Sequence, residues 1–256
     1  MSNSQIAAQL YTVREFMKTP EEIRTGMKKV KELGFEWVQI SGLGPISHEE
    51  MKEILDENGL KVCATHIPFD RMKDNMEDVL YQHKLWGCKN IGVGSMPDKY
   101  RGSAEGFTQF AKEASEVGKV FSANGFRFVY HNHKFEFEKF NGRVGMDILV
   151  EDSDKEGFDF LLDTYWVQAG EADRILWINK LKGRINVIHY KDMKIINNEQ
   201  LICEVGEGNL NWTGIVEACN NINVSQIAIE QDNCYGVDPF ECLMISRNNM
   251  IKMGLK

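Results

Sequence analysis

Strand-like apolar runs alternate with amphipathic helical segments along the whole chain. The helical segments carry apolar residues at three- and four-residue spacing. Eight apolar runs have strand character and lie at residues 6–11, 35–41, 60–66, 89–94, 126–133, 158–163, 185–190 and 225–231. Such alternation predicts parallel strands joined by helices, with both faces of the sheet covered.

Helix boundaries in the first third of the chain can be predicted from capping residues. Thr19 precedes Pro20, and Glu22 completes a capping box. Ser47 precedes a second helical segment that Gly59 ends. A chain of 256 residues is close to the usual size of a (β/α)8 barrel, about 250 residues. No G-x-G-x-x-G follows the first strand run, so we expect one closed TIM barrel over residues 1–256.

The bulk composition argues against several classes of partner. The formal net charge of −8 disfavours binding to nucleic acid. No apolar run reaches the roughly 20 residues that span a bilayer. The first residues lack the basic and apolar regions of a signal peptide, and the six cysteines are scattered, as is typical of free thiols. We therefore expect a cytoplasmic protein without membrane or nucleic-acid partners.

Four of the strand runs end in a residue type that binds metals. These residues are His131, Asp163, His189 and Glu230. A barrel gathers the C-terminal ends of its strands at one mouth, so the four would meet there. Singly, such an Asp can cap a helix and such a His can be a core residue. Together, acceptor groups would repel one another without a cation, which predicts one divalent ion: Mn, Mg, Co, Fe or Zn.

Further polar residues surround this predicted site. The two-residue period of a strand places His131 and His133 on one face, with Asn132 on the other if the strand continues. Glu136 lies past the strand end and could fold back over the mouth. His66 ends its own strand run in the same way as His131.

Three more residues have both a functional and an ordinary interpretation. Lys191 could bind an anionic oxygen or be solvated. Glu207 lies between two glycines that would let the backbone turn near a ligand, or it belongs to a surface turn. Trp166, beside Tyr165, could form an apolar wall for a ligand, and core packing is the equal alternative.

As a set, several segments resemble the xylose isomerase-like TIM-barrel superfamily, and more closely its sugar phosphate isomerase/epimerase branch. The resemblance spans essentially the whole chain and is carried by QLYTVR (9–14), YHNHKFEF (130–137), LDTYWVQAG (162–170), HYKD (189–192), GEGNLNW (206–212) and IEQD (229–232).

The resemblance implies one divalent metal held by Glu, Asp, His and Glu at the ends of strands five to eight. Asp163, His189 and Glu230 match the last three ligands. At the first ligand position, this chain has His131 where many members of the family have Glu. Either His131 replaces that ligand, or Glu136 reaches in, or the site has three protein ligands.

The resemblance also implies a sugar or cyclitol substrate and an enediolate stabilised by the metal. Candidate bases are Glu230, Glu136, His133 and His66, and His66, Lys191, Glu207 and Trp166 are candidate substrate contacts. Isomerisation or epimerisation is the first expectation, and a lyase or dehydratase of keto-sugars or inososes is the second. An abasic-site endonuclease and a non-enzymatic sugar binder are remote alternatives. A homo-oligomer is left open.

Overall fold

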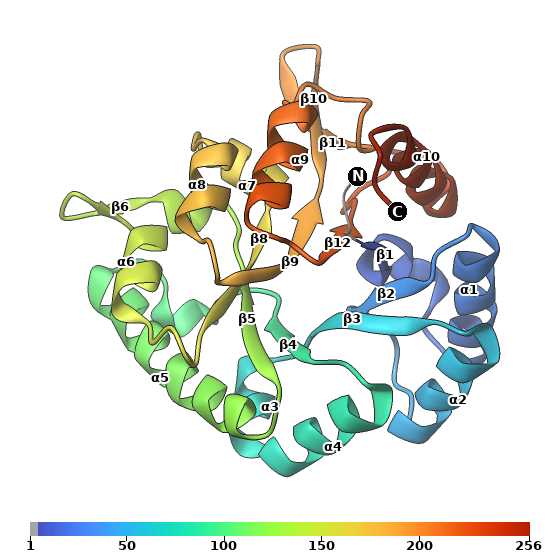
Figure 1. Cartoon of the computed structure of the whole chain (residues 1–256), viewed down its shortest axis with the longest axis horizontal. Helices are drawn as coiled ribbons and strands as arrows, with labels where there is room; N and C mark the ends of the chain where they lie inside the picture. The colour runs from blue at the N-terminus through green and yellow to red at the C-terminus, as the bar shows by residue number, and fades with distance from the viewer. Residues whose placement is uncertain (1–4) are drawn as a thin grey trace.

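The computed structural model describes residues 5–256 and contains a closed barrel of eight parallel strands. Figure 1 shows the strands at the centre of a ring of helices. The barrel strands, in the order in which they pair, are β1 (Gln5–Gln9), β12 (Gln226–Ile229), β9 (Ile185–Tyr190), β8 (Asp159–Asp163), β5 (Arg127–His131), β4 (Asn90–Val93), β3 (Lys61–His66) and β2 (Trp37–Ile40). This topology confirms the predicted (β/α)8 barrel. Residues 1–4, which the predicted domain includes, lie outside the described residues.

The helices begin where the capping residues predict. The Thr19 hydroxyl accepts from the Glu22 amide, and the Glu22 carboxylate accepts from the Thr19 amide. Gly59 adopts a left-handed φ of 57° at the end of the second helix. The helices are α1 (Pro20–Glu32), α2 (His48–Asn58), α3 (Phe69–Asp74), α4 (Met76–Trp86), α5 (Ala104–Ala123), α6 (Gly145–Asp152), α7 (Thr164–Ala169), α8 (Arg174–Lys180), α9 (Trp212–Asn221) and α10 (Pro239–Lys252). Sequence did not predict the short helices α3 and α7.

A small apolar cluster separates from the main core. Its buried members are Ala7, Cys63, Ala64, Val129, Leu161, Val187 and Ala228. Four of them, on β5, β8, β9 and β12, each precede a predicted metal ligand by two positions. Because side chains two apart on a strand point to the same face, this cluster lies directly beneath the predicted site.

Five of the predicted strands end earlier than their apolar runs, and in β1, β5 and β12 the difference is two residues. The first run was predicted to reach Tyr11, but β1 ends at Gln9 and the chain continues as the 3-10 helix η1 (Leu10–Phe16). The Gln9 side chain accepts from the Tyr11 amide and so caps this turn. β5 ends at His131 rather than His133, because the Asn132 side chain accepts from the Asp163 amide where a strand partner would lie.

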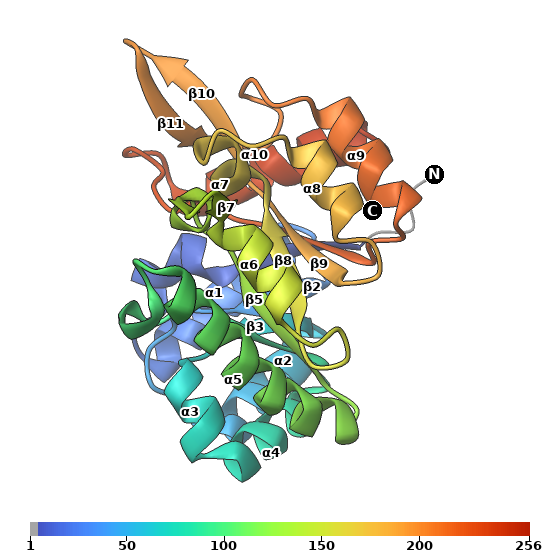
Figure 2. The same ribbon diagram turned by 90° about the vertical axis from the view of Figure 1, so that its left-hand side faces the viewer.

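Two hairpins interrupt the alternation. β6 (Lys139–Phe140) and β7 (Arg143–Val144) form the small hairpin predicted after strand five. β10 (Asp192–Ile196) and β11 (Glu199–Cys203) form a second hairpin that was not predicted. Figure 2 shows the second hairpin projecting from the body of the molecule.

Within residues 5–256, no helix combines the length and apolar character needed to cross a membrane. All six cysteines are free thiols, as predicted.

Candidate metal centre

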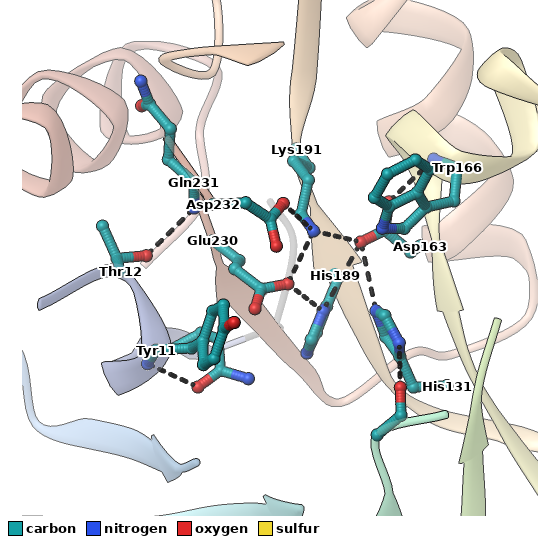
Figure 3. A network of polar contacts seen from close by, with 12 residues as sticks. Tyr11, Thr12, His131, Asp163, Trp166, His189, Lys191, Glu230, Gln231 and Asp232 are labelled. Carbon is teal, nitrogen blue, oxygen red and sulfur yellow. Dashed lines mark hydrogen bonds and ion pairs between the residues drawn. The ribbon is translucent and has the colours of Figure 1, made fainter. Parts of the chain in front are cut away.

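Four predicted ligands meet at the mouth of the barrel. One ligand atom from each of His131, Asp163, His189 and Glu230 lies within 4.8 Å of the other three. All four side chains are buried. Each stands at or just after the C-terminal end of its strand, and Figure 3 shows them converging. Residues up to 99 positions apart in sequence therefore form one compact set of nitrogen and oxygen donors.

His131 directs one ring nitrogen, Nε2, toward this set. Its Nδ1 lies 2.9 Å from the Gly94 carbonyl oxygen, which can only accept, so Nδ1 carries the proton. The other ring nitrogen, Nε2, lies 3.3 Å from Asp163 Oδ2. In the neutral imidazole, a nitrogen lone pair then faces a carboxylate oxygen. A cation between them satisfies both groups.

His189 shows the same arrangement. Its Nε2 lies 2.8 Å from the Gln39 amide oxygen, and its Nδ1 lies 2.9 Å from Glu230 Oε2. Within the described chain, neither Nδ1 nor that carboxylate oxygen has a partner with hydrogen-bond geometry. Burial opposes a charge on His189, yet Glu230 and Asp163 hold its pKa above the ordinary value. The surroundings thus favour a positive charge at Nδ1, and a metal ion can supply it. The donor set fits a divalent metal.

Lys191 is fully buried beside the four ligands. Its Nζ lies 3.0 Å from Asp163 Oδ2, 2.8 Å from Glu230 Oε2 and 2.7 Å from Asp232 Oδ2. Burial disfavours the ammonium, but the three carboxylates hold its pKa well above the ordinary value. Lys191 is therefore neither solvated nor free to bind an outside anion. Three carboxylates around one ammonium leave excess negative charge, which a divalent cation would balance.

The two carboxylate ligands remain ionised in this environment. Burial raises the pKa of Asp163 and of Glu230, but Lys191 and the neighbouring imidazoles outweigh it and hold both pKa values well below the ordinary range. The second oxygen of Asp163 also accepts from the Trp166 amide at 3.0 Å and caps α7. Asp163 thus combines the capping role that sequence allowed with a place in the four-residue cluster.

His66 borders the cluster without joining it. Its ring centroid lies 5.1 Å from that of His131 and 5.6 Å from that of His189. Burial and the neighbouring imidazoles hold its pKa well below the ordinary value, so the ring is neutral. His66 also lines two surface hollows of about 360 and 240 Å³. A larger hollow, about 550 Å³, lies against α1 and α10 and none of the four ligands line it.

His133 and Trp166 lie side by side, and His133 is next to His131. Their ring centroids are 5.2 Å apart, and the ring centroid of His133 is 4.8 Å from that of His131. In residues 5–256, His133 Nδ1 and Trp166 Nε1 are buried and have no hydrogen-bond partner. Burial lowers the pKa of His133 to about 3, so its imidazole is neutral. Two buried polar atoms without a partner thus lie beside the four-residue cluster.

Glu136 does not reach the cluster. Its carboxylate accepts from the Tyr130 hydroxyl at 2.5 Å and from the His133 amide at 2.9 Å. Tyr130 neighbours His131 on β5 and so faces the helix layer, where its ring lies 5.4 Å from Phe110 of α5. Burial raises the pKa of Glu136 to about 7.

Glu207 is also away from the cluster. It is exposed and accepts from the Asn249 side chain at 2.7 Å. Its loop is held instead by Asp192, a buried residue that sequence did not single out. The Asp192 carboxylate accepts from the amides of Met193, Gly206, Gly208 and Leu210 and from the indole of Trp212.

Gln39 is a second buried polar residue, besides Asp192, that was not predicted from the sequence. Its signal was a polar residue at the centre of the apolar run 35–41, and its side chain is fully buried between His66 and His189.

Comparison with known proteins agrees with the barrel fold. The model of the xylose isomerase-like TIM barrel family matches residues 27–233, and the chain belongs to that family. No curated protein matches the sequence significantly.

Solved structures share the fold at low sequence identity. A sugar phosphate isomerase/epimerase from Parabacteroides distasonis ATCC 8503 has 18% identity and a TM-score of 0.81, over 98% of this chain and 94% of that one. L-ribulose 3-epimerase has 16% identity and a TM-score of 0.76, over 98% and 94% of the two chains. A xylose isomerase-like TIM barrel protein from Mycobacterium smegmatis in complex with magnesium has 13% identity and a TM-score of 0.76, over 98% and 97%.

Proposed function

We propose that the protein is a divalent-metal-dependent sugar isomerase or epimerase that removes a proton α to a carbonyl group. The observation that carries this proposal is the pair of imidazole nitrogens facing carboxylate oxygens, with all four donors within 4.8 Å. His131, Asp163, His189 and Glu230 would hold the metal. When bound, a divalent ion supplies Lewis acidity toward a substrate carbonyl oxygen.

Glu230 is the residue we assign as the base. Lys191 and His189 keep its carboxylate ionised despite burial, so it can accept a proton without prior titration. Both groups approach Oε2, and we assign proton abstraction to the other oxygen, Oε1. Return of the proton to the neighbouring carbon gives isomerisation, and return to the opposite face gives epimerisation.

The neighbouring side chains suit a polyhydroxylated substrate. The Trp166 indole N–H and the neutral His133 ring can bind hydroxyl groups, and the indole offers an apolar face to a carbon skeleton. We therefore propose a sugar or cyclitol as the ligand, a small molecule rather than nucleic acid, and a cytoplasmic enzyme. The fold shared with L-ribulose 3-epimerase and with a magnesium-bound relative supports this assignment.

A lyase or dehydratase of keto-sugars or inososes is the second candidate, and one observation favours it. Epimerisation by two opposed carboxylates needs a second free base, but Glu136 lies in the helix layer and His131 takes its place among the ligands. A single base, Glu230, can still remove the α-proton while a β-oxygen substituent leaves.

A proton-exchange screen in D2O tests this function. Purified protein is incubated with a panel of keto-sugars and inososes and with Mn²⁺, Mg²⁺ or Co²⁺, and products are followed by NMR. We expect deuterium at one carbon in a metal-dependent manner, with loss of exchange in Glu230→Gln. A new stereocentre identifies epimerisation, a moved carbonyl identifies isomerisation, and an unsaturated product identifies the lyase.

Metal analysis of the same protein separates the enzyme from a sugar binder. Bound sugar without bound metal and without exchange in any combination would contradict the proposal.

A further inference from the structure

Gln39 joins two histidines of the site through the two ends of one amide. It stands on β2 with its side chain fully buried. Its Nε2 lies 2.8 Å from His66 Nε2, and its Oε1 lies 2.8 Å from His189 Nε2. An amide nitrogen only donates and an amide oxygen only accepts, so the two ends impose opposite demands on the two rings.

These contacts fix the proton positions on both imidazoles. The amide N–H donates to His66 Nε2, so the proton of the neutral His66 ring lies on Nδ1. The amide oxygen accepts from His189 Nε2–H, which leaves the Nδ1 lone pair toward Glu230 and Asp163. A reversed amide would exchange the donor and acceptor roles at both rings.

The N–H at His66 Nδ1 has one weak protein contact and belongs to a ring that lines a surface hollow. Ser41 Oγ is 3.4 Å away, a long and weak contact. On the other side is Gly94, where an added Cβ would lie only 3.1 Å from Nδ1. His66 and Gly94 both line the hollow of about 360 Å³. The absence of a side chain at position 94 thus leaves room for a ligand atom next to this N–H.

We propose that Gln39 is a positioning residue that sets both tautomers at once, keeping His189 Nδ1 free for a cation and making His66 an Nδ1–H donor to a substrate carbonyl or hydroxyl oxygen. The substrate part of this assignment rests on the proposed function. It gives His66 a role that differs from its earlier place among the candidate bases: the ring donates a hydrogen bond and does not remove a proton from carbon.

Long-range ¹H–¹⁵N correlation spectra of the full chain test the tautomers directly. In metal-free wild type at neutral pH, we expect His66 to be protonated on Nδ1 and not on Nε2. In Gln39→Met, which keeps the volume but removes both amide contacts, His66 should change to the Nε2–H form. Ser41→Ala is the matched control and should leave the His66 tautomer unchanged.

His83 serves as an internal check of folding. Its ring is held by Thr65 and by the Val79 carbonyl, away from Gln39, so its signals should be the same in every variant. A wild-type His66 that carries its proton on Nε2 would overturn the proposal without reference to any variant. So would a Gln39→Met spectrum with both His66 and His83 unchanged.

Metal affinity tests the His189 part separately. Residues that orient a ligating histidine typically contribute about 10–100-fold to metal affinity. We expect Gln39→Met to weaken Mn²⁺ binding about tenfold by calorimetry, and Ser41→Ala to leave it unchanged. Equal affinity in wild type and Gln39→Met would overturn this part. A wild-type chain that binds no Mn²⁺ would overturn both this part and the proposed function, whereas the His66 tautomer is decided by NMR alone.

Discussion

Asp163 and Asp192 are both fully buried aspartates at the same end of the barrel, but their surroundings differ. Asp192 accepts hydrogen bonds from four backbone amides and one indole, all from groups that can only donate. Asp163 Oδ2 instead faces one ring nitrogen each of His131 and His189, and the Lys191 ammonium.

The comparison distinguishes a structural carboxylate from a functional one. Burial and charge are equal at the two positions, so neither property identifies the site. The two positions differ in the kind of polar group that surrounds each carboxylate. The donors around Asp192 are all N–H groups, whereas two imidazole nitrogens beside Asp163 are groups that can bind a cation. Isosteric Asp→Asn variants at the two positions can therefore separate stability from metal binding.

The largest effect on stability is expected at the structural aspartate. Asp192→Asn replaces one accepting oxygen by an NH2 group that would face backbone N–H donors. Breaking such a buried charged network typically costs about 3–5 kcal/mol, and we expect a loss of about 4 kcal/mol in the free energy of unfolding. Urea denaturation measures it. A change below about 1 kcal/mol would contradict the role given to Asp192.

The functional aspartate should show the reverse behaviour. Asp163→Asn removes a charged ligand, and we expect Mn²⁺ affinity to fall at least about 100-fold, equivalent to about 2.7 kcal/mol. Calorimetry measures the affinity, and folded Asp192→Asn protein at low temperature is the matched control that should keep it. Equal losses of affinity in the two variants would show that the distinction is wrong.

Glu136 gives a smaller, pH-dependent effect outside the cluster. Burial raises its pKa from the ordinary value of 4.5 to about 7, so the folded state holds the proton more tightly than the unfolded state. The stability that this carboxyl contributes is therefore fully present below pH 4.5 and is lost as pH rises through about 7.

The neutral variant Glu136→Gln isolates that contribution. The free energy of unfolding of this variant, relative to wild type, should rise by about 2–3 kcal/mol as the pH is raised from acidic values to pH 8. Urea denaturation across that pH range measures the difference. A constant difference between the two proteins at all pH values would mean that Glu136 titrates normally. Because Glu136 lies in the helix layer, metal affinity should be unaffected.

The smallest effect is expected at Gly94. Its carbonyl oxygen accepts from His131, and an added Cβ would lie 3.1 Å from His66 Nδ1. Gly94→Ala should cost less than about 1 kcal/mol of stability, because the His66 ring must shift by only a few tenths of an ångström. Substrate binding should weaken more than metal binding. Unchanged binding of both would show that the space beside His66 is not used.

Much of the fold could be predicted because its signals are local. Capping residues and strand-length apolar runs give the correct order of elements, and barrel topology then brings His131, Asp163, His189 and Glu230 together. The hairpin β10–β11 was missed although its turn contains Asn197 and Asn198, both with left-handed φ, a typical hairpin signal. Its strands follow β9 after a single residue, so the apolar pattern shows no break.

The details of the site depend on directions that sequence does not contain. Glu136 lies close to His131 along the chain, but a short turn after the strand end directs it to Tyr130 in the helix layer. The role of Lys191 depends on three carboxylates from two other strands. Gln39 could have been noticed as a polar residue in an apolar strand, but its two partners come from β3 and β9 and are visible only in three dimensions.

The central claim is that one divalent cation is held by His131, Asp163, His189 and Glu230. Crystals grown with Mn²⁺, measured for anomalous scattering, test it most directly. We expect a single strong peak enclosed by the four side chains, with Lys191 remaining on the carboxylates beside it. A map with no peak among these four residues, or with the cation bound elsewhere on the barrel, would contradict it.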